Sequence, residues 1–276
     1  MSDKLTLFLY ELGSRGNPDL VARHNAEKGG YFKERRKFGT GVAEDHLKNE
    51  PNYGVYLLTG NKTGLLVFDL DNHDGALPFA EVAEKGKLIF ELLASSNLKP
   101  IMFRSSGGMG AHVWVAFRNP QVAKKVRIYA QALISKLGLK EGRKGLAHGV
   151  VEIFPKQDEA SDEHPGSLIA LPFGRNSLPV DPDTLEVIEL YNFMPPGTSQ
   201  IESIDLPIEV QVKREHSVNR TERISTSKVV DAAEEFATIE DALRTVPADD
   251  HDDWIKIGLI LKGEFGDESF PIWHTW

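Results

Sequence analysis

The chain has 276 residues and a net charge of −9, with 32 lysines and arginines against 41 aspartates and glutamates. This balance excludes a surface that is basic all round, so any nucleic-acid contact must use local basic patches. Cysteine is absent, which excludes disulfides, zinc–thiolate sites and a catalytic thiol. The sequence has no apolar run of membrane-spanning length and opens without a leader-like segment, so we expect a cytoplasmic protein with no membrane partner.

The first half of the chain alternates between strand and helix patterns. Residues 5–10 fit either a strand or the start of a helix. Residues 52–58 predict a strand, and residues 60–64 predict a hairpin turn that leads into an antiparallel partner at residues 65–71. Apolar residues at helical spacing then predict a helix over residues 78–94.

A second strand pair follows, with a glycine-rich turn between its strands. The remaining predicted elements are strands at 101–105 and 112–117, a helix at 121–137, and strands at 149–155 and 167–172. This order predicts an α+β domain with a mostly antiparallel central sheet flanked by helices.

Two carboxylates end the apolar run at residues 65–68. Asp69 and Asp71 are one residue apart, so they project from the same face of a strand. Like charges this close are costly unless a cation lies between them, and Mg²⁺ or Mn²⁺ is the natural counter-charge. An ordinary strand followed by an acidic turn would explain the same residues.

Glu152 is a third candidate, because it lies between Val151 and Ile153 on an apolar strand. A buried carboxylate is costly unless it is paired or binds metal. Three carboxylates on neighbouring strands would hold two divalent ions roughly 3.5 to 4 Å apart, as in polymerases and nucleases. The alternative is that Glu152 is an outward residue of an edge strand.

The glycine-rich turn predicts an anion site. Its backbone N–H groups are unshielded by side chains, and His112 at its exit could reach a phosphate or a sugar. A tight hairpin without any ligand could have the same sequence. The predicted nucleotide-binding residues are Arg104, Ser105, Ser106, Gly107, Gly110, His112, Lys156 and Arg175.

In this order the three motifs resemble those of the archaeo-eukaryotic primase superfamily, in its phage and mobile-element primase-polymerases. The matching segments are Asp69-Leu70-Asp71, the turn from Ser106 to Trp114 with His112, and Glu152-Ile153-Phe154-Pro155-Lys156. The resemblance implies an RRM-like catalytic core and a DNA primase-polymerase that performs template-directed nucleotidyl transfer in DNA replication. It also implies that Asp69, Asp71 and Glu152 bind the metals and that His112 is catalytic.

The same resemblance sets the expected domains and partners. Residues 1–200 would be the catalytic domain, residues 201–228 a linker or wrap-around segment, and residues 229–276 the start of a helical C-terminal domain. The expected partners are a single-stranded DNA template and primer, dNTP or NTP, and a helicase. Phage or plasmid coding in a bacterial or archaeal host would fit this type. Because the chain has no cysteine, no zinc is expected.

Two other classes remain open. Phe68-Asp69-Leu70-Asp71-Asn72 also resembles the opening motif of haloacid-dehalogenase-like phosphatases, in which the first aspartate is a nucleophile. That family does not predict the glycine turn and its histidine. A catalytically inactive replication or nucleic-acid-binding module is the other alternative, and metal-dependent nucleotide incorporation would exclude both.

Overall fold

The computed structural model describes residues 2–48, 52–72, 75–190 and 192–195, and five isolated residues beyond them: Leu243, Ile257, Leu261, Trp273 and His274. The chain divides into two compact units, Met1–Gln211 and Val212–Trp276. All elements below belong to the first unit. Apart from those five residues, the predicted linker and helical C-terminal segment lie outside the described residues, so the domain boundaries at 200 and 228 stay predictions.

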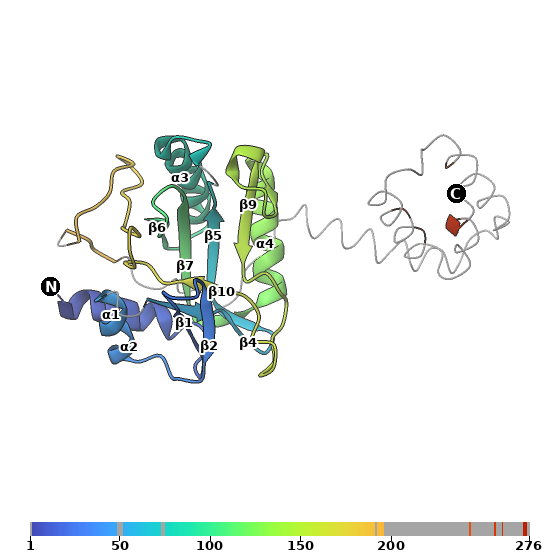
Figure 1. Ribbon diagram of the computed structural model, residues 1–276. Coiled ribbons are helices and arrows are strands. Elements are labelled where there is room, and N and C mark those ends of the chain that lie inside the picture. The colour runs from blue at the N-terminus through green and yellow to red at the C-terminus, as the bar shows by residue number, and fades with distance from the viewer. Residues whose placement is uncertain are drawn as a thin grey trace. The chain divides into compact units, whose positions relative to one another are not determined.

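The centre of the first unit is a six-stranded sheet with the order β6-β7-β5-β9-β8, in which β4 also pairs with β5 (Figure 1). All of its pairings are antiparallel except that of β8 with β9. This confirms the α+β class and the mostly antiparallel sheet. The strands are β4 (Leu58–Thr59), β5 (Lys62–Leu70), β6 (Pro100–Arg104), β7 (Ala111–Val122), β8 (Lys140–Glu141) and β9 (Val150–Phe154).

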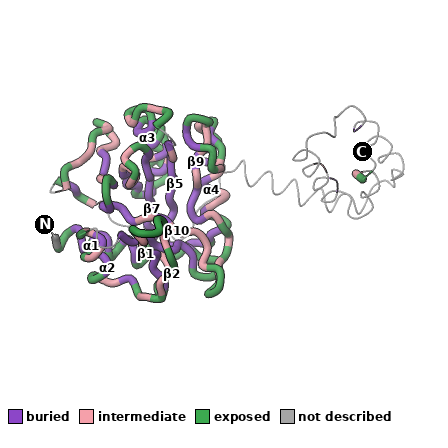
Figure 2. Tube along the Cα trace, in the orientation of Figure 1, coloured by how far each residue is buried: buried purple, intermediate pink, exposed green. Residues whose placement is uncertain are grey.

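Two amphipathic helices, α3 (Phe79–Ser95) and α4 (Ala123–Lys136), pack on one face of this sheet. The helices bury apolar residues such as Ile89 against alternate residues of β5, including Phe68 and Leu70. Because neighbouring strand residues point to opposite faces, every second residue of β5 joins this core. In Figure 2 the tube is buried along most of β5 and β7.

A second, four-stranded antiparallel sheet with the order β10-β3-β1-β2 lies against the other face, together with two helices. Leu65, Val67 and Trp114 point into the core between them. The strands and helices are β1 (Val21–His24), β2 (Tyr31–Glu34), β3 (Tyr53–Tyr56), β10 (Leu168–Ala170), α1 (Ser2–Gly13) and α2 (Thr40–Leu47).

The first element, open between strand and helix, is the helix α1. Its buried residues Leu5, Phe8, Leu9 and Leu12 have the spacing of one helical face. Strands β1 and β2 and helix α2 were not predicted, because four-residue strands carry little periodicity and are stabilised by distant partners. None of the described helices combines the length and apolar character needed to cross a membrane.

The predicted hairpin between residues 52–58 and 65–71 was wrong for most of its length. The turn is present, with Gly60 at a φ of +57°, but only Leu58 and Thr59 pair with β5. Strand β3 instead joins the second sheet, between β1 and β10. β7 takes one edge of β5 and β9 pairs with Val67–Asp69 on the other, so a hairpin as long as the predicted one would find that part of the edge occupied.

Candidate active site

The site begins with one cross-strand row of the six-stranded sheet. Asp69 on β5 lies directly opposite His112 on β7 and opposite Glu152 on β9. Directly opposed residues in antiparallel strands share a face, with Cβ atoms roughly 4.5 to 5.5 Å apart. The row therefore projects toward the second sheet, away from α3 and α4. Asp71, two residues beyond Asp69, continues on the same face as β5 ends.

The three predicted carboxylates come together at this row. One ligand oxygen each from Asp69, Asp71 and Glu152 lie within 4.8 Å of one another. Asp69 is buried and the other two are half-buried. Within the described chain, Asp69 Oδ1 is buried and accepts no hydrogen bond of good geometry. Three carboxylate oxygens this close to one another fit a hard divalent cation, so these residues suit Mg²⁺ or Mn²⁺.

His112 lies beside the cluster, with its Nε2 atom 3.2 Å from Asp69 Oδ1. Burial lowers the pKa of the imidazole, but the nearby carboxylates of Asp69 and Asp71 outweigh burial and raise the pKa above its ordinary value. The ionised carboxylates therefore favour the protonated ring. A cationic ring at the edge of an acidic cluster can bind a phosphate oxygen that enters the cleft.

Glu152 is engaged by two cationic side chains. Lys156 Nζ donates to Glu152 Oε2, and Arg143 Nε lies 3.9 Å from Glu152 Oε1. Lys156 also lies over the ring of Phe154, with Nζ 4.4 Å from the ring centroid. Lys156 was predicted to contact phosphate, whereas in the structure it pairs with the third carboxylate. Its side chain therefore positions the Glu152 carboxylate.

The glycine-rich turn between β6 and β7 is closed by its own hydrogen bonds. The Ser105 N–H donates to the Gly110 carbonyl, at 2.8 Å, and Gly110 N–H donates to Ser105 Oγ, at 3.0 Å. Gly108 has a φ of +82°, which favours glycine. A Cβ on Gly110 would lie 2.8 Å from the Leu70 carbonyl oxygen, so the turn packs directly on the end of β5. Ser105 thus shapes the turn, and Ser106 lies beside it in the cavity wall.

A cavity of about 610 Å³ opens over Asp69, Asp71 and the turn. Its far wall is Phe154 and strand β10, so the second sheet supplies one side of the cleft. The predicted residues that line it are Asp69, Asp71, Ser105, Ser106, Gly107, Gly110 and His112. This volume is in the range of small-molecule sites, which are roughly 300 to 1,000 Å³.

Four predicted residues lie outside this lining: Glu152 and its partner Lys156, and the two arginines Arg104 and Arg175. Arg104 Nε donates to the Asn176 carbonyl at 3.1 Å and so ties β6 to the loop after β10. Arg175 lines a smaller cavity, where one guanidinium nitrogen lies 3.2 Å from His24 Nε2. The two cavities share Ser106 and Ala170 in their walls, which places Arg175 next to the cleft.

The sequence did not indicate three contributors to the site region: His24, Asn72 as a cleft residue, and His46. His46 Nε2 lies 2.9 Å from the Pro172 carbonyl, and its Nδ1 accepts from Tyr53 N–H at 2.8 Å. Burial lowers the pKa of His46 to about 4, even though the backbone contacts at Pro172 and Leu171 raise it. His46 is therefore a neutral side chain that links helix α2 to Tyr53 on β3 and to Pro172 after β10. A single histidine on a short helix does not reveal this role in the sequence.

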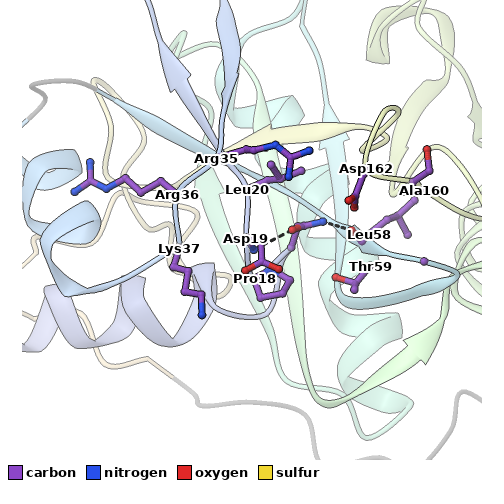
Figure 3. Close-up of a pocket in the computed structure, with 13 residues that line it drawn as sticks. Pro18, Asp19, Leu20, Arg35, Arg36, Lys37, Leu58, Thr59, Ala160 and Asp162 are labelled. Carbon is purple, nitrogen blue, oxygen red and sulfur yellow. Dashed lines mark hydrogen bonds between the residues drawn. The ribbon is translucent and has the colours of Figure 1, made fainter.

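Another cavity, of about 430 Å³, lies at the opposite end of β5 (Figure 3). Arg35, Arg36 and Lys37 reach it in succession, and Asp19 and Asp162 also line it. Figure 3 shows Arg36 directed away from Arg35; it donates to Tyr53 Oη at 3.0 Å. Because both signs of charge line the cavity and it is remote from the carboxylates, the cleft is the stronger candidate site.

The acidic cluster lies beside a glycine-rich turn in an α+β domain. This arrangement is typical of proteins that bind phosphates together with a metal ion. Residues 23–181, more than half of the chain, match the family described as the archaeo-eukaryotic primase domain of TOTE conflict systems. The chain belongs to this family, so the resemblance drawn from the motifs is confirmed. No curated protein matches the chain.

Among solved structures, the chain is similar to the polymerase domain from Mycobacterium tuberculosis ligase D in complex with DNA. The two share 15% sequence identity and a TM-score of 0.42. The match covers 62% of this chain and 75% of that one.

Proposed function

We propose that this chain is a primase-polymerase that joins nucleotides to a nucleic-acid 3′ end, or starts a primer, under the direction of a template. Membership of the archaeo-eukaryotic primase family supports nucleotidyl transfer as the class of reaction. The observation that carries the proposal is the convergence of Asp69, Asp71 and Glu152 within 4.8 Å. The three residues come from two separate regions of the chain.

In this proposal the three carboxylates hold two Mg²⁺ or Mn²⁺ ions. When bound, the ions supply activation of the attacking 3′-hydroxyl and neutralisation of charge on the phosphates. The 3′ oxygen forms a bond to the α-phosphorus, the bond from that phosphorus to the bridging oxygen breaks, and pyrophosphate leaves. The hydroxyl proton passes to solvent.

The remaining residues bind the triphosphate. His112 donates to a phosphate oxygen, and Ser106 and the backbone N–H of Gly107 add neutral donors along the turn. Arg175 lies next to the cleft and Arg104 is bonded to the 174–176 loop, and both would take the outer phosphates or the template. Lys156 stays with Glu152 and adds positive charge at the cluster.

Template and primer would lie on local basic patches, because the net charge is −9. Binding by such patches weakens as salt rises, through release of counterions from the phosphates. The family description favours a role in a conflict system over one in replication. A helicase partner, the phage or plasmid setting and cytoplasmic location are further parts of the proposal.

The test is incubation with single-stranded DNA template, labelled dNTP or NTP and Mg²⁺ or Mn²⁺, with and without a primer. We expect incorporation that needs both template and metal and that stops with EDTA. The matched control is the Asp69→Asn, Asp71→Asn double variant. Release of phosphate from small phosphoesters without polymer would support the phosphatase alternative, and no reaction of either kind would support an inactive module.

A further inference from the structure

Asn72 follows directly after Asp71 and is 7% exposed. Every strong hydrogen-bonding group of its side-chain amide is engaged. Its Oδ1 accepts from Leu77 N–H at 3.0 Å, and its Nδ2 donates to the Leu77 carbonyl at 2.8 Å and to the Met109 carbonyl at 3.1 Å. A buried amide with both donors used is held in one orientation.

The two carbonyls belong to different parts of the fold. Leu77 lies in the connection from β5 to α3, five residues away, so its bonds are local turn bonds of the kind asparagine often makes. Met109 lies in the glycine turn, 37 residues away. The two bonds to Leu77 are enough to close the local turn after β5. The third bond, to Met109, joins the end of β5 to the glycine-rich turn.

Other hydrogen bonds fix the two segments that the bond between Asn72 and Met109 joins. The Asp71 carbonyl accepts from Leu146 N–H at 2.8 Å, which fixes the backbone at the end of β5. On its far side the turn receives a longer bond, 3.4 Å, from Asn176 Nδ2 to the Ser106 carbonyl. On the near side, Asn72 and the close approach of Gly110 to Leu70 set the distance between turn and carboxylates.

We propose that Asn72 is a positioning residue that sets the glycine turn at the distance from Asp71 that a metal-bound triphosphate requires. This role rests on the proposed function, because the carboxylates would hold the metal and the turn would hold the phosphates. Asn72 itself would contact neither the metal nor the phosphates. Its loss should weaken nucleotide binding more than it slows the bound complex.

Asn17 provides a matched control at the other end of β5. Its Nδ2 donates to the Leu58 carbonyl at 3.0 Å and its Oδ1 accepts from Asp19 N–H at 3.0 Å, bonds that are drawn dashed in Figure 3. It therefore makes the same kinds of bond as Asn72, without a link to the cleft. Asn17→Ala measures the cost of losing such an amide away from the site.

The experiment compares Asn72→Ala, Asn72→Ser and Asn17→Ala with the wild-type chain. The serine hydroxyl can still bond locally but ends one bond short of the amide nitrogen, so Asn72→Ser isolates the Met109 bond if Asn72→Ala does not fold. We expect both Asn72 variants to raise the KM for nucleotide about tenfold with a smaller change in kcat. Asn17→Ala should lower the melting temperature and leave KM unchanged.

Hydrogen–deuterium exchange of the amides of residues 105–110 gives a readout that does not need activity. Exchange should be faster in the Asn72 variants and unchanged in Asn17→Ala. Unchanged exchange, or a KM no higher than that of Asn17→Ala, would overturn the inference. A wild-type chain that incorporates no nucleotide would instead overturn the proposed function, and the exchange result would still decide whether Asn72 holds the turn.

Discussion

On strand β5, neighbouring residues point to opposite faces of the six-stranded sheet, and the two faces use them differently. Phe68 and Leu70 are fully buried under α3 and α4. Asp69 and Asp71 point to the other face, where the second sheet covers Leu65 and Val67 but leaves a cavity over the strand end. The face under α3 and α4 therefore supplies stability, and the face at the cleft supplies the candidate catalytic residues. Substitutions of neighbouring residues on β5 should therefore affect either stability or activity.

The largest effect should come from removing charge on the site face. Asp69→Asn or Asp71→Asn keeps the size of the side chain but removes a metal ligand, and should slow incorporation at least about 1,000-fold, which is about 4 kcal/mol. Repulsion among the carboxylates falls while attraction to His112 is lost, so the melting temperature should change little. Single-turnover incorporation and thermal melting measure the two quantities. Incorporation by either variant within tenfold of the wild type would contradict the metal assignment.

The neighbouring residue should show the reverse. Phe68→Ala leaves a cavity under the helices and should lower the free energy of unfolding by about 3 to 5 kcal/mol. Phe68→Leu should cost less, because more of the volume is kept. Urea denaturation measures both, and incorporation per folded molecule at low temperature should stay near that of the wild type. A variant of normal stability without activity would show that the two faces are not separable.

The buried His46 side chain should make the stability of the folded chain fall at acidic pH. Burial lowers the pKa of His46 from 6.5 to about 4, so the folded state keeps the ring neutral. Its stabilising contribution is complete above pH 6.5 and falls as pH drops toward 4, by about 3 kcal/mol in total. In His46→Asn the amide oxygen can replace Nδ1 as acceptor for Tyr53 N–H, without a titrating ring. Denaturation from pH 7.5 to 4 should be less pH-dependent in the variant; equal slopes would refute this role.

The smallest effect should come from substitution of His112. This residue lies on the same face as the carboxylates, and we assign it no role as a metal ligand. His112→Ala should raise the KM for nucleotide about tenfold, about 1.4 kcal/mol, because one phosphate contact is lost. The chemical step should change less than in the aspartate variants. Steady-state kinetics over a range of nucleotide concentrations separate KM from kcat. An unchanged KM would show that His112 acts only on Asp69.

Much of the fold could be predicted where the pattern is local. The helix over residues 78–94 and the strand pair around the glycine turn have strong periodicity and clear turn residues, and the structure contains both. Strands at residues 52–58 and 167–172 were predicted and contain β3 and β10, whereas the four-residue strands β1 and β2 were not predicted. The pairing of these four strands into a second sheet could not be predicted, because they come from segments far apart in the chain. This pairing depends on contacts that no short window of sequence contains.

The same division applies to the site. Motif spacing alone determined that Asp69 and Asp71 share a face, since strand residues alternate, and it pointed to Glu152 because a charge in an apolar strand needs a partner. Only the tertiary structure decided that β9 lies beside β5 in the register that opposes Glu152 to Asp69. It also decided that β10 walls the cleft and that Asn72 reaches the glycine turn. Register and packing are set by the whole core, whereas side-chain alternation is set by the backbone of each strand.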